Sequence, residues 1–172
     1  MTEFKQVEIE QFNKNPFVAI GQEWMLITAS HNGKINTMTA SWGGLGVLWN
    51  KNVAFIVIRP TRYTKQFVDN SSTFSLSFFD QKYKDQLGYL GSVSGKDVDK
   101  IKISKLETCD KDATPYFTQA NTVLLCQKLY AQEFTPQSFV DDKLCKEIYK
   151  NNDYHTLYVG EITKILVKQE LK

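Results

Sequence analysis

The feature that most constrains the fold is a series of short β-compatible segments separated by tight turns. Residues 24–30 (Trp-Met-Leu-Ile-Thr-Ala-Ser) and residues 35–42 flank the tetrapeptide His-Asn-Gly-Lys at 31–34. Asn-Gly between two such segments is a strong hairpin signal, because both turn positions need positive φ. The sequence therefore predicts an antiparallel hairpin early in the chain.

Further strand patterns follow this hairpin. Residues 53–58 are apolar enough for a strand buried on both faces, and residues 73–79 alternate hydroxyl and apolar side chains, which predicts a half-buried strand. Residues 122–131 and 155–167 predict two long strands, the second with a bulge at Gly160 where a barrel wall bends. Antiparallel strands with a few short inserted helices predict a mainly β fold, a closed or partly closed β-barrel.

The segments between these strands are less regular. Residues 43–46 (Gly-Gly-Leu-Gly) and residues 91–95 predict loops, the second of them flexible. Thr61 predicts the N-cap of a short helix, and residues 80–90 predict a second helix capped by Asp80. Residues 134–152 are mixed, with a helical pattern near their end, and suggest no function.

Length and composition favour one folded domain spanning residues 1–172. Apolar residues make up 42% of the chain and aromatic residues 13%, enough for a hydrophobic core. The net charge of +2 is spread without blocks, which argues against a nucleic-acid partner. The first twenty residues are too polar for a signal peptide, and no apolar run approaches the ~18 residues of a membrane span.

Three cysteines, Cys109, Cys126 and Cys145, are widely separated and form no C-x-x-C pair. An odd, scattered set predicts reduced thiols and a cytoplasmic protein rather than a disulfide framework. With only two histidines and no cysteine cluster, the sequence predicts no transition-metal site.

Residues 59–64 (Arg-Pro-Thr-Arg-Tyr-Thr) follow a predicted strand and lead into a predicted helix. A helix start attracts phosphate through unpaired N–H groups, and guanidinium groups add charge-assisted hydrogen bonds to phosphate oxygens. The segment therefore suggests a phosphate site; a capped helix with two solvated arginines is the simpler alternative. The G-x-x-x-x-G-K-[ST] loop of nucleoside triphosphate sites is absent.

Residues 36–42 (Asn-Thr-Met-Thr-Ala-Ser-Trp) end the predicted hairpin with small polar side chains, which leave the backbone accessible. Main chain from Thr37 to Ser41 offers the alternating donors and acceptors that the pyrimidine edge of a flavin requires, and Trp42 offers a wall for its ring. An ordinary amphipathic strand with polar residues outward is the alternative interpretation.

Two further elements complete the candidate site. Residues 92–100 form a polar, glycine-containing stretch able to close over a ligand and to bring a lysine near phosphate or flavin. His155 begins the last predicted strand at the expected barrel mouth, where it would contact a ring edge, position a nicotinamide or relay a proton. A surface loop and a polar surface histidine are the corresponding alternatives.

These segments together resemble the flavin reductase-like, FMN-binding split-barrel family, and within it the flavoredoxin-type branch. The resemblance runs from about Phe17 to Val167 and depends on residues 36–42, 59–64, 94–100 and 155–161 in this order. It implies a Greek-key split barrel that forms a homodimer and holds FMN non-covalently near the subunit interface. Residues 42–49 are bulkier than the small-residue stretch of many two-component flavin reductases, which bears on whether free flavin exchanges as a substrate.

The resemblance also assigns roles to single residues. It places His155 beside the flavin ring as the catalytic candidate. It implies that the flavin ring is lined by Thr37, Met38, Thr39, Ala40, Ser41 and Trp42. The phosphate would be bound by Arg59, Tyr63 and Thr64, and the pocket closed by Ser94, Gly95 and Lys100.

Three functions remain open on this sequence. The first is an oxidoreductase that takes hydride from NADH or NADPH through FMN and passes electrons to flavin or to a partner acceptor. The second is a non-enzymatic FMN electron-transfer protein reduced only by a partner protein, which Trp42 or Trp49 covering the ring would favour. The third is a cofactor-free β-barrel interaction protein.

Overall fold

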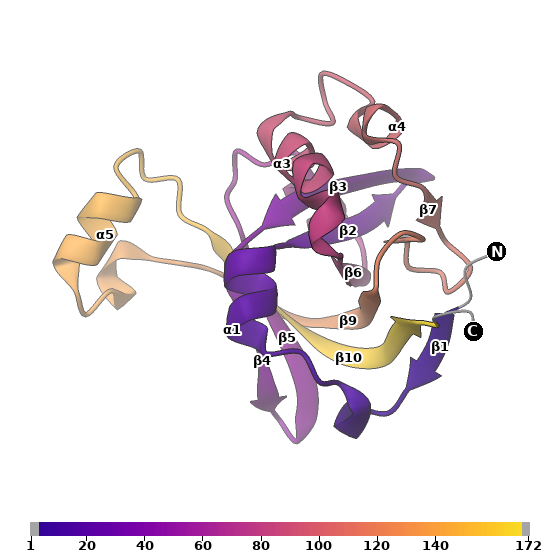
Figure 1. Cartoon of the computed structure of the whole chain (residues 1–172). Coiled ribbons are helices and arrows are strands. Elements are labelled where there is room, and N and C mark those ends of the chain that lie inside the picture. The colour runs from indigo at the N-terminus through magenta and orange to yellow at the C-terminus, as the bar shows by residue number, and fades with distance from the viewer. Residues whose placement is uncertain (1–3, 170–172) are drawn as a thin grey trace.

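The computed structural model describes residues 4–169 and confirms the mainly β class (Figure 1). One large sheet follows the strand order β3-β2-β6-β9-β10-β5-β4, with β1 paired to β10 outside this path, and β7 and β8 form a small separate ribbon. Every strand pair in the large sheet is antiparallel. The strands are β1 (Phe4–Val7), β2 (Met25–His31), β3 (Lys34–Ala40), β4 (Gly43–Leu48), β5 (Lys51–Ile58), β6 (Thr73–Phe78), β7 (Thr108–Cys109), β8 (Tyr116–Phe117), β9 (Thr122–Glu133) and β10 (Thr156–Lys168).

The helices are short and lie in the connections between strands. Helices α3 and α4 lie together on one side of the sheet, and α5 lies far from the barrel body (Figure 1). No helix among residues 4–169 is long and apolar enough to cross a membrane. The helices are η1 (Ile9–Gln11), α1 (Pro16–Val18), η2 (Ala19–Glu23), α2 (Thr64–Asn70), η3 (Gln81–Tyr83), α3 (Lys84–Ser92), α4 (Lys100–Ser104), η4 (Pro136–Ser138) and α5 (Asp142–Ile148).

The sheet curls into a split barrel because the two strands at its ends, β3 and β4, follow one another in the chain. Strands β3 and β4 stand at opposite ends of the strand order, yet only Ser41 and Trp42 connect them. So short a link brings the two sheet ends together at that point, while no ladder joins β3 to β4 among the described residues. The split between these strands is where the candidate site lies.

Two hydrophobic clusters occupy opposite faces of the sheet. On β2, Met25 and Ile27 belong to the cluster inside the barrel, whereas Leu26 belongs to the outer cluster under α3. This alternation follows from the two-residue period of a strand. It also explains why β6 is buried on both faces rather than half-buried as predicted. Ser75 and Ser77 are fully buried on the face of β6 that the outer cluster covers, and β6 lies between β2 and β9.

The bulge predicted at Gly160 is confirmed. The pairing of β10 with β9 shifts register between Val159 and Gly160. A Cβ atom at Gly160 would lie 2.6 Å from Cζ of Phe74 and 2.9 Å from Cβ of Cys126. Glycine therefore allows the barrel wall to close on its own core here.

The glycine segment after the first hairpin is a strand, not the predicted loop. Residues 43–48 form β4 and pair with β5. Gly43 has a φ of 149°, and a Cβ atom there would lie 2.5 Å from the carbonyl oxygen of Phe55. The glycines thus serve a close approach of two strands rather than flexibility.

Two predicted helix caps and one predicted loop differ in the structure. Helix α2 begins at Thr64, because a turn closed by the Arg62 N–H and the Arg59 carbonyl comes first, and Thr61 provides no cap. Asp80 does stand at the N-cap position, before η3 and α3, but its carboxylate accepts a hydrogen bond from Asn121 and makes no capping hydrogen bond. Residues 91 and 92, predicted in a flexible loop, form the last turn of α3.

Residues 134–153 leave the barrel between β9 and β10 and form a projecting arm, which carries α5 (Figure 1, at the left). The pairing of β9 with β10 continues to Glu133 and Thr156 and stops there. A helix near the end of this segment was predicted, and α5 confirms it. The arm returns to the barrel directly before His155, at the candidate site.

Candidate functional site

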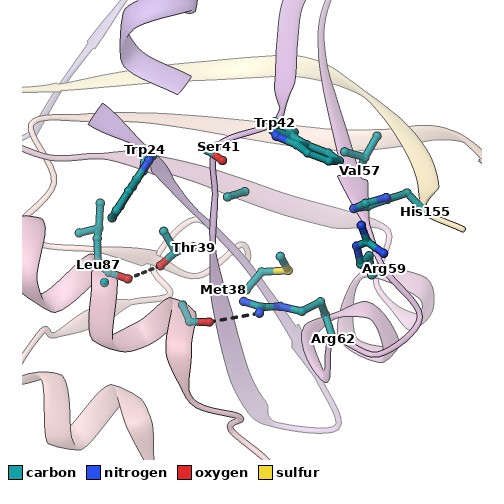
Figure 2. Close-up of a pocket in the computed structure, with 13 residues that line it drawn as sticks. Trp24, Met38, Thr39, Ser41, Trp42, Val57, Arg59, Arg62, Leu87 and His155 are labelled. Atoms are coloured by element: carbon teal, nitrogen blue, oxygen red, sulfur yellow. Dashed lines mark hydrogen bonds between the residues drawn. The ribbon is translucent and has the colours of Figure 1, made fainter. Parts of the chain in front are cut away.

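A cavity of about 430 Å³ lies at the split of the barrel, between β3, α3 and the start of β10 (Figure 2). Of the residues singled out from the sequence, seven line it: Met38, Thr39, Ala40, Ser41, Trp42, Arg59 and His155. Six lining residues were not among the predicted contacts: Trp24, Val57, Arg62, Leu87, Gly88 and Gly91.

The other six predicted residues do not line this cavity. Thr37 is buried against Thr28, with their hydroxyl oxygens 2.9 Å apart. Thr64 is buried and accepts a hydrogen bond of 2.9 Å from the Asn36 amide. The remaining four lie around the neighbouring hollows near α2 and α4: Tyr63 and Ser94 in one, Gly95 and Lys100 in the other.

The wall formed by β3 offers an open edge of main chain. β3 pairs with β2 on one side, and no described strand pairs with it on the other. In an antiparallel pair, alternate residues of an edge strand turn their N–H and C=O groups away from the partner. Ser41 and Trp42 continue this edge without strand pairing. The cavity therefore has backbone donors and acceptors along one wall, as a planar heterocycle requires.

Helix α3 closes the cavity from the other side and packs tightly on β3. The hydroxyl of Thr39 donates a 2.5 Å hydrogen bond to the Leu87 carbonyl. A Cβ atom at Gly91 would lie 3.1 Å from Cβ of Thr39. Gly91 therefore permits this close approach, whereas a Cβ atom at Gly88 would have no neighbour within 4 Å.

Trp24 stands at one rim of the cavity in a strained backbone conformation. Its φ of 74° and ψ of 163° fall in a region that is essentially restricted to glycine and costs roughly 1–3 kcal/mol. The Lys84 ammonium lies 3.2 Å from the centre of the indole ring and also donates to the carbonyls of Gln22 and Glu23. This cation–π contact holds the ring in place. No local sequence pattern marks Trp24, because Lys84 reaches it from a distant helix.

Arg59 is engaged by the arm. Its guanidinium group lies 2.5 Å from the Asp153 carboxylate, donates to the Ile148 carbonyl at 3.1 Å, and stacks 5.3 Å from the ring centre of Tyr149. The hydrogen bond from Arg59 keeps the pKa of Asp153 below its usual range. The charge of Arg59 is thus compensated within the protein.

Arg62 is in a different electrostatic position. Its guanidinium group donates to the Gly91 carbonyl at 3.1 Å, and among residues 4–169 no carboxylate forms an ion pair with it (Figure 2). Burial lowers its pKa. Lys100 is 3% exposed and, in the described part of the chain, donates only to the carbonyls of Leu90 and Val93. Its pKa is lowered to about 8 by burial and by the charge of Arg62. This side of the cavity carries uncompensated positive charge.

His155 lines the cavity across from α3 and lies beside Trp42, with the two ring centres 5.2 Å apart. Burial lowers its pKa to about 4; the charge of Arg59 acts in the same direction, and Asp153 opposes it. Its Nδ1 atom lies 2.8 Å from the Tyr149 hydroxyl. The imidazole is therefore neutral at physiological pH and has its second nitrogen, Nε2, left for a ligand.

Among residues 4–169, no three His, Cys, Asp or Glu side chains are close enough to hold a metal ion.

Residues 17–172 match the sequence family described as flavin reductase like domain. An uncharacterized protein of Aeropyrum pernix is 31% identical over 70 residues, which are 41% of this chain and 26% of that protein. That match therefore spans about a quarter of the relative's own length.

Solved structures of similar fold include three flavin-related proteins. The FMN-binding domain of a flavin reductases-like enzyme from Shewanella baltica has a TM-score of 0.69 at 15% identity, over 96% of this chain and 78% of that chain. A flavoredoxin from Methanosarcina acetivorans has a TM-score of 0.66 at 22% identity, over 92% of this chain and 75% of that chain. An NADH:FAD oxidoreductase from Streptomyces globisporus has a TM-score of 0.62 at 14% identity, over 86% of this chain and 78% of that chain.

At these identities the structural likeness shows the fold, the FMN-binding split barrel. The family match covers well over half of the sequence and includes the split, the cavity and the arm. The chain therefore belongs to the flavin reductase-like family.

Proposed function

We propose that this protein binds FMN in the cavity at the barrel split and acts as an oxidoreductase. In this proposal it takes hydride from NADH or NADPH and passes electrons to free flavin or to a partner acceptor. The observation that carries the proposal is the pairing of an open β3 edge with uncompensated charge at Arg62 and Lys100. Planar heterocycles require the first feature, and phosphate monoesters require the second.

The size and lining of the cavity fit this cofactor. Its volume of about 430 Å³ lies within the ~300–1,000 Å³ of typical small-molecule sites. Indole rings of Trp24 and Trp42 stand at its rims, and apolar Met38, Val57 and Leu87 also line it (Figure 2). When bound, FMN supplies the redox chemistry that amino-acid side chains lack.

The residues of the chain then divide the work of binding. Main chain from Met38 to Trp42 would hydrogen-bond the polar edge of the ring, with the Ser41 hydroxyl as an additional group. Arg62 would bind the phosphate, the role that the family resemblance assigns to Arg59, with Lys100 contributing charge nearby. His155, neutral and beside Trp42, would donate or accept a hydrogen bond at the ring side of the cavity.

The choice between a reductase and a passive electron carrier depends on access to the ring. Trp49 lies at the β4–β5 turn, where it packs against Tyr130, and does not line the cavity. Trp42 lines it and is 47% exposed. A cavity left open in this way favours direct approach of a nicotinamide. Similarity to both an NADH:FAD oxidoreductase and a flavoredoxin keeps the carrier as the second candidate.

We also propose that the protein forms a homodimer. Several large apolar side chains near the split and on the arm are exposed, which is unusual for a monomer surface. They are Phe17, Trp42, Val140 and Leu144. Light scattering at increasing protein concentration tests this proposal; a constant monomer mass would contradict it.

The experiment that tests the function begins with FMN binding. Purified protein is incubated with FMN, desalted, and its visible spectrum recorded; we expect retained yellow colour in a one-to-one ratio. The loaded protein is then mixed anaerobically with NADH or NADPH in a stopped-flow instrument. Bleaching within seconds supports the reductase, FMN retention without bleaching supports the carrier, and a protein that retains no FMN contradicts both.

A further inference from the structure

The projecting arm returns to the barrel through a single buried side chain. Within residues 134–153, only Tyr149 is buried, with 6% of its surface exposed. It follows directly after α5, a helix that has no buried residue of its own. A side chain that is buried while its surroundings are solvated is held by specific contacts.

Those contacts connect Tyr149 to the candidate site. Its hydroxyl oxygen lies 2.8 Å from Nδ1 of His155, and the two rings meet edge to face with centres 5.6 Å apart. The Arg59 guanidinium covers the phenol ring of Tyr149. The ring of Tyr154 also stacks on that phenol, with the two ring centres 4.8 Å apart. The phenol is thus fixed on several sides before it reaches the imidazole.

The direction of the hydrogen bond follows from the two acidities. Burial raises the pKa of the Tyr149 phenol, so it keeps its proton at physiological pH. Burial lowers the pKa of His155, so its imidazole is neutral. A phenol is a stronger acid than a neutral imidazole N–H, so the hydroxyl donates and Nδ1 accepts. The imidazole proton then lies on Nε2.

We infer that Tyr149 is a positioning residue that holds the His155 ring in one orientation and in the tautomer with Nε2–H available to the cavity. The partner of one ring nitrogen decides which nitrogen carries the proton. Apart from Tyr149, the groups that face His155 are the Trp42 ring and the charged pair of Arg59 and Asp153. The importance of this role for turnover rests on the proposed function, but the tautomer itself does not.

The test compares two tyrosines of the arm. Tyr149→Phe removes the hydroxyl that meets His155 and keeps the ring under Arg59. Tyr154→Phe is the matched control, because its hydroxyl bonds to Asn152 and Cys145 and not to histidine. Nitrogen-15 NMR of the flavin-free protein reports the tautomers of both histidines, with His31 in the first hairpin as internal reference.

We expect wild type and Tyr154→Phe to show His155 with Nδ1 as acceptor. In Tyr149→Phe the ratio of the two tautomers should fall by about 2- to 12-fold, the equivalent of one net hydrogen bond. His31 should be unchanged. An unchanged His155 in Tyr149→Phe, or an equal change in Tyr154→Phe, would overturn the inference.

A second readout uses the FMN-loaded protein. Tyr149→Phe should still bind FMN and should slow reduction by NAD(P)H by a similar 2- to 12-fold factor. Reduction at the wild-type rate would overturn the link between the tautomer and turnover. A protein that shows the expected tautomer but binds no FMN would overturn the proposed function and leave the Tyr149–His155 contact standing.

Discussion

The two sides of the cavity use the same residue type in different ways. On the arm side, Arg59 is neutralised by Asp153 and bonds to the arm main chain. On the helix side, Arg62 has only the Gly91 carbonyl as partner, and Lys100 lies behind it with no carboxylate among the described residues. Charge on the arm side thus holds protein to protein, whereas charge on the helix side meets no carboxylate within residues 4–169.

Burial sharpens this difference. A buried positive charge without a counter-ion is costly, and Lys100 is almost completely buried. The carbonyl groups of α3 and its following turn compensate part of that cost. An anion bound next to Arg62 would compensate the rest, which is the physical basis of the phosphate site that we propose.

The largest change in FMN affinity is expected from a substitution at Arg62, on the helix side of the cavity. Arg62→Ala should weaken FMN binding by about 1.5–3 kcal/mol, roughly 10- to 150-fold, because it removes hydrogen bonds to a charged group. Riboflavin, which lacks the phosphate, should bind nearly as before. Fluorescence titrations with both ligands measure this, and Arg62→Lys is the control that keeps the charge. An equal loss for riboflavin would exclude Arg62 as the phosphate ligand.

Lys100 should give a smaller, pH-dependent effect. Its pKa of about 8 lies below the ordinary value of 10.5, so its charge is lost as the pH rises through 8. FMN affinity should therefore fall by about 3- to 10-fold between pH 7 and pH 9.5. Lys100→Met should bind FMN at every pH about as weakly as wild type does at pH 9.5, and so lose this pH dependence. If the variant keeps the wild-type pH profile, Lys100 does not contribute to anion binding.

His155 on the arm side should affect stability rather than phosphate binding. Its pKa of about 4 in the folded protein lies below the ordinary 6.5, so the unfolded chain takes up a proton first as the pH falls. Folding stability should drop between pH 6.5 and pH 4 by about 1 kcal/mol from this group, after screening by solvent. Urea denaturation of wild type and His155→Gln measures the difference, and parallel pH profiles would contradict it.

Arg59 should have the smallest effect on the choice of ligand. Arg59→Ala should change the FMN-to-riboflavin affinity ratio by less than about 2-fold, because its charge is already paired with Asp153. The arm should instead become easier to cleave, since its anchor is lost, and limited proteolysis measures this. A large loss of FMN affinity with riboflavin unaffected would return the phosphate role to Arg59.

Local patterns anticipated much of the barrel. The Asn-Gly turn, the apolar run of β5 and the glycine in β10 each depend on neighbours in sequence, so their structures follow from short-range sterics. The same holds for the polar end of β3, where Thr39 to Trp42 reach the cavity. Thr37 belongs to the same pattern but lies against Thr28, because cross-strand pairing decides which hydroxyls are covered.

The sequence by itself determined the antiparallel strands, the turn chemistry and the two segments, 36–42 and 59–64, that border the cavity. Only the tertiary structure decided which arginine is free, because Asp153 reaches Arg59 from 94 residues away. It also decided that Lys84 holds Trp24 and that the arm delivers Tyr149 to His155. Charges and rings are paired by three-dimensional packing, and packing depends on contacts between distant segments that no local pattern encodes.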